Sequence, residues 1–151
     1  MLGRMKVVRV EAKTFRTAFA AASVYFGIVF GVGFVLGAIR VSLLVPRVGA
    51  RYAELAEMPL MFIAIFIAAG YLHSKFAEIR TPGYWLLVGV IALAMLVSAE
   101  LLLAVVLADR SVGEYIVSRD PVSGAVYLGM LVLFAVMPRL RLNVSRTQNA
   151  A

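Results

Sequence analysis

Four charged residues lie within or beside long apolar stretches of this sequence: Arg40, Glu54, Glu57 and Glu100. An ionised side chain at the centre of a bilayer costs about 2.5–3.5 kcal/mol even on the lenient insertion scale, so such residues are kept where they have a partner or a function. The chemistry open to this set is that of carboxylates and one guanidinium. They can form ion pairs, take up and release a proton, or bind a cation.

The positions of Arg40 and Glu100 along their apolar stretches suggest that the two are partners. Arg40 lies six residues before Pro46, which is about 9 Å of helix, and Glu100 lies eight residues before Ala108, which is about 12 Å. Both helices would run in the same direction across a membrane. The two opposite charges would therefore lie at similar depth, and we predict that they pair.

Glu54 and Glu57 are three residues apart, and Arg51 precedes Glu54 by the same spacing. Residues at this spacing share one face of a helix. Arg40, Glu54, Glu57 and Glu100 can thus converge near one surface of the membrane. One interpretation is a site for a cation, a proton or a polar head group. The other is a structural ion-pair network that holds three helices together.

Four glycines in the first apolar stretch form two GxxxG pairs, Gly27 with Gly31 and Gly33 with Gly37. Gly33 lies about 240° round the helix from Gly27, so the two pairs lie on different faces. Glycine allows close approach of helix backbones within lipid. The pairs therefore predict helix packing, either within one bundle or, for the second face, between copies of the chain. The spacing does not fit a dinucleotide-binding loop.

The composition excludes several classes of function. The chain has no cysteine, which rules out disulfides, thiolate metal sites and cysteine nucleophiles, and it has a single histidine, His73. We expect no metal site, no cofactor and no catalytic residues. The net charge of +7 does not indicate nucleic-acid binding, because the basic residues flank apolar stretches instead of forming a patch on a polar domain.

The elements that would position these residues are four membrane-spanning helices. Of the 151 residues, 63% are hydrophobic and only 15% are charged, which is too little charge for a water-facing surface. A bilayer core needs about 20 residues of helix. We predict one all-α integral membrane domain, a four-helix bundle with spans at about 18–45, 55–74, 82–108 and 121–138. A short basic surface helix would precede the bundle, and the tail after residue 141 would be disordered.

The distribution of lysine and arginine predicts the orientation of this bundle. The first 17 residues carry five such residues, the 75–80 connection carries two and the tail carries three, against four in the other two connections. This bias places both termini in the cytoplasm. Tyr71, Tyr84 and Trp85 would then lie at the inner membrane interface, where aromatic residues are enriched.

One segment of about a fifth of the chain, Gly33 to Met61, carries a resemblance. Its features are Gly-x-x-x-Gly-x-x-Arg ending at Arg40, the turn residues Pro46 and Gly49, and Ala-Glu-Leu-x-Glu-x-Pro ending at Pro59. The segment resembles an uncharacterised family of small four-span bacterial membrane proteins. The resemblance implies a multi-pass protein of the bacterial cytoplasmic (inner) membrane and brings no catalytic role with it.

Two functions are compatible with these features. The first is a non-enzymatic structural or accessory subunit, or a self-associating bundle, whose partners are the lipid bilayer and a second copy or a larger membrane complex. The alternative is an oligomeric proton- or cation-coupled small-molecule transporter or channel that uses Glu100. The two differ in one observable feature. A transporter should place Glu100 on a water-accessible cavity, whereas a structural pair should bury Glu100 against Arg40 without a path to water.

Overall fold

The computed structural model describes residues 2–79, 81–108 and 121–148, with side chains from residues 13–79, 81–103 and 121–142. These residues form helices and no strand. The elements are α1 (Leu2–Ile39), the short π-helix η1 (Arg40–Leu44), α2 (Val45–Val48), α3 (Ala50–Lys75), α4 (Pro82–Ala108) and α6 (Pro121–Gln148). Four helical stretches are long and apolar enough to cross a membrane: Lys13–Val48, Ala50–Lys75, Pro82–Leu103 and Pro121–Leu142.

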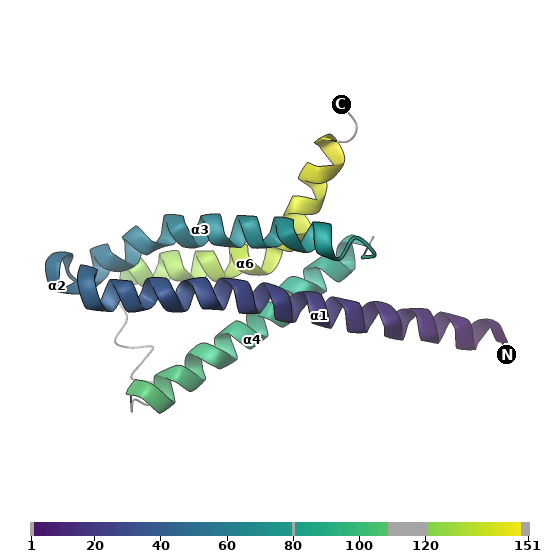
Figure 1. Cartoon of the computed structure of the whole chain (residues 1–151), viewed down its shortest axis with the longest axis horizontal. Helices are drawn as coiled ribbons and strands as arrows, with labels where there is room; N and C mark the ends of the chain where they lie inside the picture. Colours follow the sequence, from purple (N-terminus) through teal and green to yellow (C-terminus); the bar gives the residue numbers. More distant parts are fainter. Residues whose placement is uncertain (1, 80, 109–120, 149–151) are drawn as a thin grey trace.

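The four long helices form a bundle in which the backbone of each helix lies close to those of two others. Helices α1 and α6 both pack against α3 and α4. Figure 1 shows α1, α3 and α6 running nearly along one direction, while α4 crosses them obliquely. Aromatic pairs join the helices that lie diagonally opposite. The rings of Tyr25 and Phe134 stack with centroids 4.5 Å apart, and those of His73 and Trp85 lie 3.9 Å apart.

The first span is part of one helical rod that is longer than the sequence predicted. The basic N-terminal segment continues into the span as α1, so it is not a separate surface helix. Pro46 does not end the rod, because it lies in the first turn of α2, where its missing N–H and fixed φ are tolerated. The rod ends at Gly49, whose φ of 80° is in the left-handed region that glycine adopts without strain. Helix α3 begins at the next residue, so α1 and α3 form a hairpin with a one-residue turn.

The last helix contains Pro138, and its freed backbone carbonyl has a specific partner. Pro138 has no N–H to donate to the carbonyl of Phe134. The Tyr25 hydroxyl donates to that oxygen at 3.1 Å, and Nε2 of His73 donates to the carbonyl of Pro138 itself at 2.7 Å. Beyond this point the yellow end of α6 turns away from the bundle (Figure 1). The helix continues past Arg141 to Gln148.

The backbones of α4 and α6 approach closely at Gly89. A Cβ at this position would lie 2.7 Å from the carbonyl carbon of Ala135 and closer still to its oxygen. The neighbouring Trp85 is also enclosed by the bundle, with 1% of its surface exposed and its Nε1–H donated to the carbonyl of Ile79 at 2.9 Å. Trp85 is therefore a packing residue, whereas Tyr71 is 46% exposed.

Candidate binding cavity

A cavity of about 360 Å³ lies between the four long helices, at the end of the bundle that holds the α1–α3 turn. All four charged residues that the sequence singled out line it: Arg40, Glu54, Glu57 and Glu100. The remaining lining is largely apolar and includes aromatic rings from α1 and α6 and methionines from α3 and α6. The site is thus charged in one part and apolar in the other, as small-molecule sites in proteins commonly are.

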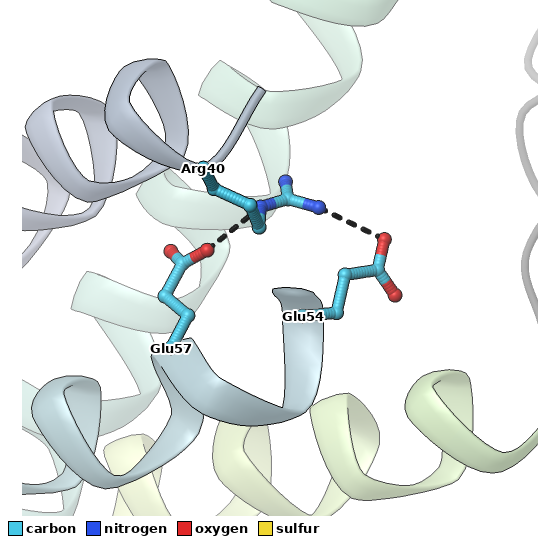
Figure 2. Close-up of polar contacts among 3 residues, drawn as sticks. All are labelled: Arg40, Glu54 and Glu57. Atoms are coloured by element: carbon cyan, nitrogen blue, oxygen red, sulfur yellow. Dashed lines mark hydrogen bonds and ion pairs between the residues drawn. The ribbon is translucent and has the colours of Figure 1, made fainter. Parts of the chain in front are cut away.

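Arg40 lies between two carboxylates that come from one face of α3 (Figure 2). Its Nη1 donates a hydrogen bond to Oε1 of Glu54 at 3.0 Å. Its Nε lies 2.8 Å from Oε2 of Glu57, which is ion-pair distance, although the N–H is not aligned for a hydrogen bond to that oxygen. The three side chains are 15–24% exposed, so the cluster is largely enclosed.

The one-residue turn at Gly49 explains why these three residues meet. Arg40 lies nine residues before the turn at Gly49. In an antiparallel hairpin it therefore comes level with the positions eight or nine residues after the turn. Glu57 lies eight residues after the turn and Glu54 lies one helical turn nearer to it. Arg40 also begins the π-helix η1, which is closed by a bond from the N–H of Val45 to the carbonyl of Arg40. Single π turns of this kind are frequent at functional sites, where they shift side chains relative to a regular helix.

Glu100 has a different partner from the one that the sequence predicted. The hydroxyl of Tyr127, on α6, donates a hydrogen bond to Oε2 of Glu100, on α4. Arg40 forms its ion pairs with Glu54 and Glu57 in place of Glu100. The physical reason is the arrangement of the helices. The hairpin brings α3 directly beside Arg40, whereas α4 crosses α1 obliquely (Figure 1).

The four glycines of α1 divide between two faces. Gly33 and Gly37 line the cavity, and a Cβ at Gly33 would lie 3.4 Å from Cε of Met61. Gly27 and Gly31 are exposed, and a Cβ at either position would meet nothing within 4 Å. The buried face of α1 is formed by other residues, chiefly Ala18, Ala21, Ala22, Tyr25 and Val29. Within this bundle, then, the α1 glycines do not mark the close helix contacts.

Sequence reasoning missed Tyr127 and the aromatic lining. Tyr127 lies in an apolar stretch with no charged neighbour, so nothing in its local pattern pointed to Glu100. Phe30 and Phe34 are spaced by one helical turn on α1 and both line the cavity, with ring centroids 6.4 Å apart. Their spacing was visible in the sequence, but such a stripe more often indicates core packing.

The chemistry available in this cavity is that of binding and proton exchange. Among the described residues, no group of three or more histidine, aspartate or glutamate side chains is placed to hold a metal ion. The polar groups that line the cavity are carboxylates, one guanidinium and one phenol. Comparisons of the chain with protein families, curated proteins and solved structures gave no match.

Proposed function

We propose that this chain is a multi-pass protein of the bacterial cytoplasmic membrane that binds a small molecule in the four-helix cavity, as an oligomeric proton- or cation-coupled transporter or channel. The observation that carries this proposal is the position of Glu100. It lines a cavity shared by four helices and accepts a hydrogen bond from a neutral hydroxyl, instead of being closed off against Arg40. A carboxylate in that position can exchange a proton for a cation.

The exterior of the bundle supports insertion into a membrane. Large apolar side chains on every long helix point outward, with exposed fractions of about 60%: Val35, Ile67, Leu102, Leu128 and Val132. An apolar exterior of this kind is stable against lipid and aggregates in water. All-helical spans also satisfy their backbone hydrogen bonds internally, as lipid requires. The excess of lysine and arginine near the termini and in the 75–80 connection favours both ends in the cytoplasm.

In this proposal, the two parts of the charged cluster have different roles. Arg40, Glu54 and Glu57 tie the α1–α3 hairpin together at the outer end of the cavity. Glu100 and Tyr127 lie on the other two helices and provide the exchangeable group. When Glu100 is ionised it attracts a cation, and when it is protonated that attraction is lost, so occupancy of the cavity follows the protonation of one carboxylate.

The proposal predicts that the cavity is reached by water from the outside. The chain has no native cysteine, so single-cysteine variants report one position each. Met58→Cys, in the cavity lining, should react with an impermeant thiol reagent added to intact cells, because a thiol reacts as its thiolate and needs water. Ile67→Cys is the matched control on the same helix. It should stay unlabelled, because residue 67 is 61% exposed on the outer, lipid-facing surface of the bundle.

Two further variants determine the orientation in the same assay. Val48→Cys, at the α1–α3 turn, should be labelled in intact cells, and Ser74→Cys, at the other end of α3, only after permeabilisation. Labelling in the reverse order would overturn the orientation. An unreactive Met58→Cys in a folded protein that labels normally at Val48→Cys would overturn the water-accessible cavity and with it the transport proposal.

A structural or self-associating role is the second candidate, and the outward face of Gly27 and Gly31 favours it. Both glycines leave open space that a second helix could occupy at short distance. Gly31→Leu should then reduce the oligomeric fraction in mild detergent, measured by light scattering coupled to size exclusion, several-fold more than Val35→Leu. Val35 is the control because it is 57% exposed on the same helix and already carries a side chain. Equal oligomeric fractions in the two variants would exclude this face as an interface.

A further inference from the structure

The structure points to the chemical class of molecule that the cavity takes: we propose that it binds a lipophilic organic cation, such as an aromatic quaternary ammonium. This inference rests on the proposed function, in which the cavity is a solute site. It follows from three properties of the lining that are independent of one another. These are the balance of charge, the size of the cavity relative to an ion, and the presence of aromatic faces.

The charge balance excludes anions as the preferred ligand. The described lining residues include three carboxylates and one guanidinium, a formal charge of −2 when all are ionised. The guanidinium of Arg40 lies within 3.0 Å of Glu54 and 2.8 Å of Glu57, so a phosphate or carboxylate ligand would have to compete with two internal carboxylates for it. Glu100 faces the same cavity from α4. A cation is attracted by this lining, and an anion is repelled.

The size and spacing of the groups distinguish an organic cation from a metal ion. The three carboxylates are not placed to ligate one metal, and the described residues offer no other such group. A cavity of about 360 Å³ is also much larger than one ion and its direct ligands require. The excess volume is lined by apolar side chains, which favour a ligand with its own apolar surface.

The aromatic lining completes the argument. Phe30 and Phe34 project from consecutive turns of α1, and Tyr127 and Phe134 line the cavity from α6. Aromatic faces attract quaternary ammonium groups through their quadrupoles. Met61 and Met130 add flexible, polarisable thioethers that adapt to ligands of different shape. A lining with carboxylates, aromatic rings and methionines therefore matches a cation that carries apolar groups.

The test measures the binding of phenyltrimethylammonium to the purified full chain in phosphatidylcholine nanodiscs by isothermal titration calorimetry. Zwitterionic lipid avoids attraction of the cation to the bilayer itself. We expect benzenesulfonate, of similar size and opposite charge, to bind at least about tenfold more weakly, since one charge contact in a partly dry site is worth more than a decade of affinity. Sodium at equal concentration should not displace the organic cation.

Glu100→Gln should weaken binding of phenyltrimethylammonium by about tenfold or more, for the same electrostatic reason. Glu78→Gln is the matched control, because Glu78 is exposed outside the cavity. Phe30→Leu should weaken binding about threefold or more by removing one aromatic face. Emission of Trp85, the single tryptophan, should be unchanged in each variant, which verifies the fold.

Equal affinity for benzenesulfonate, or full affinity in Glu100→Gln, would overturn the inference. The inference would also fail if the wild-type protein did not bind phenyltrimethylammonium while the Met58→Cys variant was labelled from outside. In that case the proposed solute cavity would stand, but with a different ligand. If Met58→Cys were unreactive in the folded protein, the proposed function would fail together with the inference. The comparison of the two ligands on the wild-type chain needs no mutation, so a variant that does not fold leaves the test intact.

Discussion

Gly89→Ala should lower the free energy of unfolding by about 1–3 kcal/mol, the usual cost of forcing extra atoms into a well-packed contact. The new Cβ would lie 2.7 Å from the carbonyl carbon of Ala135 and closer still to its oxygen. Both are backbone atoms, so no side-chain rotation relieves the overlap, and α4 must move away from α6. The expected loss is the more informative because the same substitution in an open helix position stabilises by about 0.8–1.0 kcal/mol.

The chain is unfolded with an increasing mole fraction of a denaturing detergent, and the fluorescence emission of Trp85 reports the midpoint. Trp85 is buried one helical turn from Gly89. Gly129→Ala is the matched control, because Gly129 lies on α6 and a Cβ there would meet nothing within 4 Å. We expect Gly129→Ala to be neutral or slightly stabilising. Similar midpoints for the two variants would show that α4 and α6 do not approach as closely as described.

Arg40→Leu should also destabilise the chain strongly, by about 1–3 kcal/mol. Removing one member of a buried ion pair costs about 3–5 kcal/mol, and the smaller figure is expected here because the three side chains are 15–24% exposed. The substitution removes the guanidinium that separates Glu54 from Glu57, so two carboxylates on one helical face then repel each other. The same detergent titration measures the loss.

A triple variant separates this explanation from a general loss of packing. Arg40→Leu combined with Glu54→Gln and Glu57→Gln should recover much of the stability, because no uncompensated charge remains in the cluster. Arg47→Leu is the control for removing an arginine from the same region, since Arg47 is exposed and its Nη1 donates to the carbonyl of Leu43, four residues earlier in the same helical rod. If stability recovered instead when Arg40→Leu was combined with Glu100→Gln, the result would support the Arg40–Glu100 pair that the sequence predicted.

The pairing of Arg40 shows how far the linear sequence reaches. Counting residues along a helix estimates how deep a charge lies, and by that measure Arg40 and Glu100 were level. The depth of a residue does not specify the direction in which its side chain points around the helix axis. It also does not specify which neighbouring helix lies in that direction. The hairpin at Gly49 brings Glu54 and Glu57 against Arg40, and the oblique crossing of α4 leaves Glu100 to Tyr127.

The glycines show the same limit. Four glycines in α1 satisfied a motif for close helix packing. The tight backbone contact is instead at Gly89, which is not part of a GxxxG pair. A glycine allows close approach of backbones, but the approach happens only where two helices cross. The crossing point of α4 and α6 depends on the lengths and angles of all four helices, which local patterns do not contain.

By itself, the sequence determined the number and approximate extent of the long apolar helices, because an apolar stretch of about 20 residues must satisfy its backbone hydrogen bonds within itself. It also determined that Glu54 and Glu57 share one helical face, since local spacing decides this. The tertiary structure decided which groups meet. The partners of Arg40 and Glu100, the hydroxyl of Tyr25 on the carbonyl freed by Pro138, and the shared cavity all join residues far apart in the chain. Such contacts depend on the rotation and crossing of packed helices, and these are properties of the whole bundle.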